Sequence, residues 1–204
     1  MATKCTHFAH LEARLVDLRL KFLEAQINDE LADPATFSPD LDSIAAFRLL
    51  MHAEIEDFLE RKAKENLDRI DSAFVKTAAE SSRAFPELLY IATVANRPLE
   101  AKRAFDIVDL KSDVSDMIGA ARNLIKSNHG IKEASFSSLS VFAGKTADEI
   151  DSTLSASLNS YGKIRGDVAH QSTRYSSTIN APSAEFTSAK DLVDGLAHYF
   201  DLTS

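Results

Sequence analysis

The stretch SIAAFRLLMHAEIEDFLERKAKENLDRID, residues 43–71, decides the fold class. Its apolar residues recur every three or four positions, which is the spacing of one face of an α-helix. They are Ile44, Phe47, Met51, Ile55 and Phe58. Asp42 or Ser43 can cap the start, and a charged run from Glu60 to Asp71 continues the helix. The pattern predicts a long amphipathic helix.

The same spacing predicts a helix on the N-terminal side of this stretch, over about residues 10–33, with Leu11, Leu15 and Leu18 on its apolar face. The segment DPATFSPD at 33–40 ends it, because two prolines disfavour helical geometry in the residues that precede them. We expect a loop there.

Four more helical segments follow on the C-terminal side. Residues 73–96 show a less regular pattern in which Pro86 is the expected helix start. The next helix extends to Gly130, which suits a C-terminal cap. A capping box at 146–149 (TADE) opens a helix to about His170, and a loop over 171–182 precedes the last helix.

Only residues 135–142 (SFSSLSVF) alternate as a strand would, and they lack a comparable partner. A short helix or an extended connector therefore fits this segment better than a sheet. The fold class is expected to be all-α. With 204 residues and no convincing linker, the chain is predicted to be a single helical domain over 1–204, with an N-terminal helix at about 10–33 and a core at about 41–204.

Composition excludes several functional classes. A single cysteine, Cys5, excludes an intrachain disulfide, and the longest apolar runs fall far short of the roughly 20 residues that cross a bilayer. We therefore expect a cytoplasmic protein with no membrane partner. The formal net charge of −8 disfavours nonspecific coating of polyanions, and no DNA partner is expected.

Common catalytic motifs are absent from the sequence. Gly144-Lys145-Thr146 matches the end of a phosphate-binding loop, but Leu139 stands where that loop needs its first glycine. A loop glycine before a capped helix explains the same residues. The chain has no H-E-x-x-H, its histidines are scattered, and it has no G-x-S-x-G. We expect no metal and no cofactor.

The segment YGKIRGDVAH, residues 161–170, carries residue types suited to phosphodiester chemistry. The guanidinium of Arg165 can hold a phosphate through two hydrogen bonds, and the imidazole of His170 titrates near neutral pH. Asp167 precedes His170 by three residues, so both lie on one helical face and the carboxylate can fix the imidazole tautomer. In the plainer interpretation, Arg165 and Asp167 are surface ion-pairing groups and His170 interacts with the helix dipole.

Spacing alone does not single out this segment. Arg122 and His129 give a second arginine–histidine match near the end of the preceding helix. The context of the two matches differs, because only the later one ends in an apolar residue followed by Ala-His, at 168–170, before a break and a last helix.

In this context RGDVAH, residues 165–170, resembles the R-N-x-I-A-H motif of the HEPN superfamily of small all-α proteins. Residues 51–59 (MHAEIEDFL) resemble an early helix of that family, in which an acid precedes an aromatic residue, and Glu56 matches the acid. The similarity covers about residue 41 to the C-terminus and is closest to the RiboL-PSP and MAE-type branches. Where the family has a polar residue after the arginine, this chain has Gly166.

The resemblance implies a metal-independent endoribonuclease of bacterial toxin–antitoxin or phage-defence type, whose site is formed across a homodimer. His170 would act as general base or acid and Arg165 would stabilise phosphate charge, leaving 2′,3′-cyclic phosphate and 5′-hydroxyl ends. RNA is the implied substrate, and an antitoxin protein is a further implied partner. The alternative is a catalytically inactive HEPN module that binds RNA, a nucleotide or a protein. The acidic charge and Gly166 favour that alternative.

Overall fold

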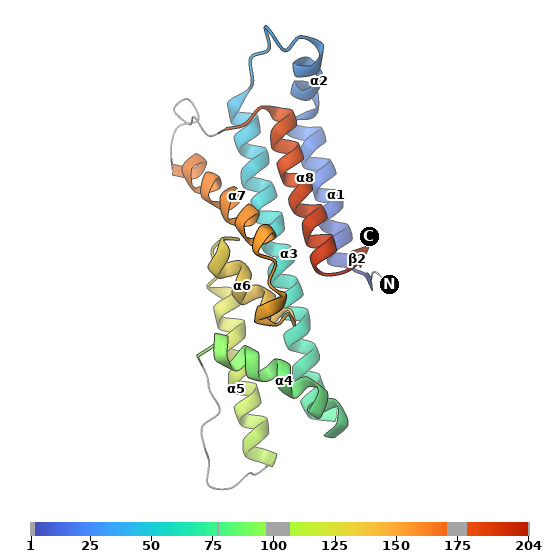
Figure 1. The fold of residues 1–204 in the computed structure, drawn as a ribbon, viewed down its shortest axis with the longest axis vertical. Coiled ribbons are helices and arrows are strands. Elements are labelled where there is room, and N and C mark those ends of the chain that lie inside the picture. The colour runs from blue at the N-terminus through green and yellow to red at the C-terminus, as the bar shows by residue number, and fades with distance from the viewer. Residues whose placement is uncertain (1–2, 77, 97–106, 171–178, 204) are drawn as a thin grey trace. The chain divides into compact units, whose positions relative to one another are not determined.

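The computed structural model describes residues 3–76, 78–96, 107–170 and 179–203. Within these ranges the chain is almost entirely helical, which confirms the all-α prediction (Figure 1). The helices are α1 (Thr6–Phe22), α2 (Glu24–Ala32), α3 (Leu41–Lys76), α4 (Ala78–Val94), α5 (Ile107–Lys126), α6 (Glu133–Phe142), α7 (Ser152–His170) and α8 (Pro182–Tyr199). A short 3-10 turn, Ala147–Glu149, precedes α7, and β1 (Thr3–Lys4) pairs in parallel with β2 (Leu202–Thr203).

The chain forms two compact units. The first comprises Met1–Phe58, Gly130–Glu133 and Asp151–Ser204, and the second comprises Leu59–His129 and Ala134–Ile150. Helix α3 therefore contributes residues 41–58 to the first unit and 59–76 to the second. The single domain expected from chain length stays a prediction.

The first unit is built from α1, α2, the N-terminal half of α3, α7 and α8. Helix α8 packs against α1, α2 and α7, and in Figure 1 it lies beside α1. The apolar face predicted for α3 is confirmed, because all five of its members are buried. Phe58 on that face makes edge-to-face contacts with Phe8 and Phe200, at 6.0 Å between ring centroids in each case. These contacts tie both ends of the chain to α3.

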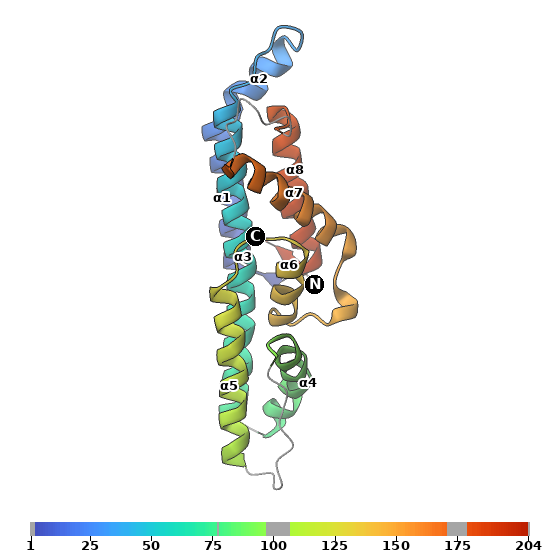
Figure 2. The same cartoon turned by 90° about the vertical axis from the view of Figure 1, so that its left-hand side faces the viewer.

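The second unit contains the C-terminal half of α3 with α4, α5 and α6. Helices α4 and α5 are in contact, and α5 runs alongside α3 in both Figure 1 and Figure 2. Asn66 of α3 donates a hydrogen bond of 3.0 Å to the carbonyl of Phe142 at the end of α6. The core consists of apolar side chains from all four helices, including Leu67, Ile70, Leu88, Ile91, Met117, Ile118, Phe136 and Phe142.

The N-terminal half of the chain departs from the sequence prediction at helix ends. The helix expected over 10–33 begins earlier and is two helices, α1 and α2, that meet at Leu23. The cap of α3 is neither Asp42 nor Ser43 but Asp40, whose carboxylate accepts from both of their backbone N–H groups. The hydroxyl of Ser43 also donates to Asp40, and this bond lowers the pKa of the Asp40 carboxyl. Several residues in this loop could cap, and the sequence does not rank them.

Three further boundaries were predicted wrongly. Pro86 lies inside α4 rather than at its start, and the burial of Leu88 and Ile91 outweighs the hydrogen bond that the proline removes. Helix α5 ends at Lys126, so Gly130, at φ 139°, makes a later turn and is not its cap. The capping box at 146–149 is confirmed, with Glu149 accepting from the Thr146 N–H at 2.7 Å, but it starts the 3-10 turn and not α7.

Helix α7 itself begins after Asp151, whose carboxylate accepts from the N–H groups of Thr153 and Leu154. Residues 135–142 lie in the short helix α6, as one of the two sequence interpretations expects. Part of the loop expected over 171–182, namely 171–178, lies outside the described residues.

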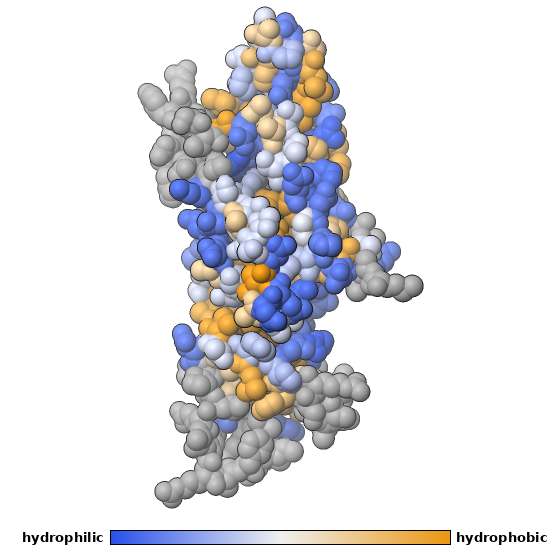
Figure 3. All heavy atoms as spheres, viewed as in Figure 1, coloured by the Kyte–Doolittle hydropathy of each residue, from blue (hydrophilic) through white to orange (hydrophobic). Residues whose placement is uncertain are grey.

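Polar residues dominate the surface that Figure 3 displays. Large apolar side chains that are more than half exposed are few among the described residues, namely Val16, Leu20 and Leu31. In the described part of the chain, no helix has the length and apolar character needed to traverse a lipid bilayer.

A buried ion pair joins α3 to α8 in the first unit. Arg48 donates from Nε to Oε1 of Glu185 at 2.8 Å, and its Nη2 pairs with Oε2 of the same carboxylate. The Arg48 side chain is 1% exposed and that of Glu185 is 0% exposed. Two charges removed from water in this way are stable only when they are paired.

Removing one member of the pair is expected to destabilise the fold strongly. Glu185→Ala leaves the Arg48 charge buried without its partner, which costs about 3–5 kcal/mol of unfolding free energy. Arg48→Met combined with Glu185→Leu recovers most of that loss, because no charge then remains buried. Urea denaturation of the intact chain measures both variants.

Lys190→Ala is the matched control, because Lys190 and Asp194 form an exposed ion pair on α8. Its urea midpoint should equal that of the wild type. A Glu185→Ala midpoint equal to that of this control would contradict a structural role for the buried pair.

Candidate functional site

The predicted motif residues lie at the C-terminal end of α7. Arg165, Gly166, Asp167 and His170 all belong to this one uninterrupted helix, and His170 is its last described residue. The side chains of residues 164–170 lie outside the described part of the chain. The backbone therefore gives the placement of the motif within the first unit, and the roles of its side chains stay predictions.

Helix α7 packs in the first unit through apolar side chains on one of its faces. Leu154, Leu158 and Tyr161 are buried at helical spacing. The next residue, Gly162, is also buried and comes close to α3. A Cβ atom at Gly162 would lie 3.6 Å from Nε2 of His52 on α3 and 3.4 Å from Ile131. Residue 162 is three positions before Arg165, so this close approach lies about one turn from the motif.

Glu56, the acid predicted to support the site, lies on α3 one turn beyond His52. Its carboxylate accepts a hydrogen bond from the backbone N–H of Gly130, and its Oε2 is 3.7 Å from Nδ1 of His52. The side chain is 19% exposed, so it is mostly shielded from water. Glu56 thus fixes the turn at Gly130, whose φ of 139° suits glycine.

These contacts bring two distant parts of the sequence together. His52 and Glu56 from residues 51–59 lie in the same unit as Gly162 of α7, and His52 is close to both Gly130 and Gly162. Residues 51–59 and α7 are therefore neighbours at His52, and the described approach is at Gly162, three residues before Arg165. The structure does not describe a contact between Glu56 and Arg165 or His170.

The second arginine–histidine match has a structural explanation. Arg122 on α5 bonds to Asp68 at 2.7 Å and to Asp71 at 3.2 Å, and both acids lie on α3. The bond to Asp68, followed by that to Asp71, raises the pKa of the Arg122 guanidinium. The group is therefore engaged in holding α5 against α3, which makes Arg122 and His129 a useful control for the α7 motif.

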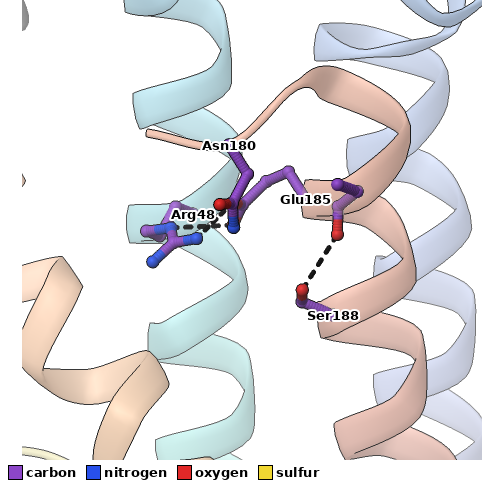
Figure 4. Close-up of polar contacts among 5 residues, drawn as sticks. Arg48, Asn180, Glu185 and Ser188 are labelled. Carbon is purple, nitrogen blue, oxygen red and sulfur yellow. Dashed lines mark hydrogen bonds and ion pairs between the residues drawn. The ribbon is translucent and has the colours of Figure 1, made fainter. Parts of the chain in front are cut away.

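A polar cluster in the same unit as the motif was not predicted from the sequence. The Cζ atom of Arg48 lies 4.9 Å from the ring centroid of Tyr161 on α7, while the rest of the guanidinium pairs with Glu185. Figure 4 shows Arg48 reaching from α3 toward Glu185 on α8, with Asn180 beside the carboxylate. Burial, followed by the charge of Glu185, raises the pKa of the Tyr161 hydroxyl, so this group stays protonated.

A signal for this cluster was present in the sequence. Arg48 lies four residues after Ile44 and three before Met51, so it falls at the spacing of the apolar face. Glu185 likewise lies four residues before the buried Ala189. Two opposite charges at core positions of two helices indicate a buried pair.

The described residues contain no group of three or more His, Cys, Asp or Glu side chains arranged to hold a metal ion. Comparison with known proteins finds no family model, no curated protein and no solved structure that matches the chain.

The contact between Glu56 and Gly130 gives a testable expectation. Glu56→Ala removes an acceptor from a partly buried N–H and should lower the unfolding free energy by about 1–3 kcal/mol. Glu56→Gln keeps an oxygen at that position, so its unfolding free energy should fall by less than half as much. Urea denaturation measures the difference, and equal losses in the two variants would exclude the hydrogen bond as the cause.

Proposed function

We propose that the protein is a metal-independent endoribonuclease of bacterial toxin or defence type. One observation supports this proposal above the others. Arg165 and His170 lie on a single helix, and this helix packs at Gly162 against the α3 segment that carries His52 and Glu56. A histidine that transfers protons and an arginine that stabilises phosphate charge are residue types suited to transesterification without a metal.

The proposed reaction begins with the ribose 2′-hydroxyl. His170 removes its proton, or in the second role protonates the 5′-oxygen that leaves. The 2′-oxygen attacks the adjacent phosphorus, the bond to the 5′-oxygen breaks, and a 2′,3′-cyclic phosphate forms. Arg165 stabilises the negative charge that builds on the phosphate oxygens, because its guanidinium is always protonated and can donate two parallel bonds.

Helical geometry favours a site shared by two chains. Five residues along an α-helix correspond to a rise of about 7.5 Å and a rotation that leaves the two side chains about 140° apart. One helix therefore presents Arg165 and His170 in different directions, and a second copy of α7 supplies the missing group. We propose a homodimer in which the two α7 helices meet at Gly166, whose lack of a side chain permits close approach.

In the proposed mechanism, Asp167 and Glu56 act by positioning other groups. Asp167 lies one helical turn before His170, where a carboxylate can orient the imidazole by accepting its second N–H. Glu56 acts by holding the Gly130 turn beside His52. An antitoxin protein that binds the dimer and covers the site belongs to the same proposal.

A second candidate function is a noncatalytic binding module on the same scaffold. The net charge of −8 favours it, because a polyanionic substrate is repelled at long range. Gly166 favours it as well, since the position after the arginine lacks the polar group of the family motif.

Cleavage of mixed cellular RNA in the presence of EDTA separates the two functions. Arg165→Ala and His170→Ala should each lower the cleavage rate by about 100-fold or more, since each removes a group that acts in the transition state. Arg122→Ala and His129→Ala are the matched controls and should cleave within about twofold of the wild type.

Two outcomes would count against the ribonuclease. Loss of wild-type cleavage in EDTA would show that a metal is needed. RNA left intact by folded wild-type protein would favour the binding module.

A further inference from the structure

A pocket of about 480 Å³ opens between α3, α7 and α8 in the first unit. This volume lies in the range of about 300–1,000 Å³ that is common for small-molecule sites. Most of its polar lining is uncharged and consists of Thr153, Ser157, Ser160, Tyr161, Asn180 and Ser188. Arg48 and two acids, Asp151 and Asp191, also line it.

Two buried polar atoms of lining residues have unused hydrogen-bonding capacity. Nη1 of Arg48 and Oη of Tyr161 make no hydrogen bond of normal geometry within the described part of the chain, although the Tyr161 hydroxyl interacts with the nearby Glu185 carboxylate. The two residues are only 1% and 4% exposed. Buried polar atoms are nearly always hydrogen-bonded, so a molecule in the pocket that supplies an acceptor would account for both groups.

The charges of the described residues around the pocket favour an uncharged molecule over an anion. Glu185 neutralises the charge of Arg48 through its contacts with Nε and Nη2. Asp151 and Asp191 add two negative charges, and the lining residues that the structure describes include no lysine. A phosphate or carboxylate would meet more negative than positive charge there.

The remaining groups match the chemistry of hydroxyls. Ser157 and Ser188 already donate to the carbonyls of Thr153 and Ala184, so their oxygens are left to accept. The carboxylates of Asp151 and Asp191 accept as well, whereas Arg48 Nη1 donates. A ligand for this pocket must therefore both donate and accept at several points, which a set of neighbouring hydroxyl groups does.

We propose that this pocket binds an uncharged polyhydroxylated molecule of the size of a monosaccharide. One ligand hydroxyl accepts from Arg48 Nη1 and bonds to Tyr161 Oη, and other hydroxyls donate to Asp151 and Asp191. Leu154 and Leu192 provide an apolar wall for the carbon skeleton. The site does not depend on the proposed ribonuclease activity, because it uses neither Arg165 nor His170.

Titration of the intact ¹⁵N-labelled protein tests the proposal, with D-ribose, D-glucose, D-galactose and myo-inositol as probes and inorganic phosphate as the anionic comparison. At least one probe should shift the amide signals of the pocket residues saturably, with a Kd on the order of millimolar. Phosphate should not shift them. No saturable shift with any of the four probes up to about 50 mM, or saturable shifts with phosphate alone, would overturn the proposal.

The variant Tyr161→Phe tests whether the sugar binds in this pocket. This variant removes only a hydroxyl that makes no hydrogen bond of normal geometry within the described part of the chain, so the urea midpoint should change little. Binding of the sugar should weaken about three- to tenfold. Tyr90→Phe on α4, which removes an exposed hydroxyl outside the pocket, is the matched control and should bind as the wild type does. Equal affinity of Tyr161→Phe and Tyr90→Phe would overturn the assignment.

Discussion

The first unit depends on two opposite charges that are almost inaccessible to water. Because such charges must be paired, their pairing constrains how the helices of this unit pack. Arg48 on α3 and Glu185 on α8 are separated by 137 residues, yet the guanidinium and carboxylate face each other through two contacts. An axial shift or rotation of either helix would leave both charges buried and unpaired. Because Tyr161 of α7 lies against the same guanidinium, the pair also sets the position of the helix that carries the motif.

The helices were predictable because helical periodicity is visible in a single sequence. The apolar face of α3 is a clear case, since burial follows its predicted positions from Ile44 to Phe58. Helix ends were less predictable because each depends on which nearby side chain accepts the first N–H groups. Asp40 caps α3 although Asp42 and Ser43 are equally suited by type. Pro86 shows in addition that packing can hold a helix across a residue that disfavours it.

The candidate site was harder to predict from the sequence than the helices were. Arg165 and His170 were chosen through resemblance, because their spacing alone also selects Arg122 and His129. The structure gives the second match a structural role, since Arg122 is engaged by Asp68 and Asp71. The cluster of Arg48, Glu185 and Tyr161 was missed, because its members come from three helices far apart in sequence and meet only after folding. A second copy of the chain, which the proposed site needs, leaves no pattern in one sequence.

Transesterification by Arg165 and His170 uses the ribose 2′-hydroxyl as nucleophile, and the chemical identity of the RNA ends reports this directly. Wild-type protein should be incubated with a short RNA of defined sequence in EDTA, and the products analysed by mass spectrometry before and after mild acid, which opens cyclic phosphates. The expected products carry a 2′,3′-cyclic phosphate on one fragment and a 5′-hydroxyl on the other. Fragments with 3′-hydroxyl and 5′-phosphate ends would contradict the proposed chemistry, because water rather than the 2′-oxygen would then have attacked the phosphorus.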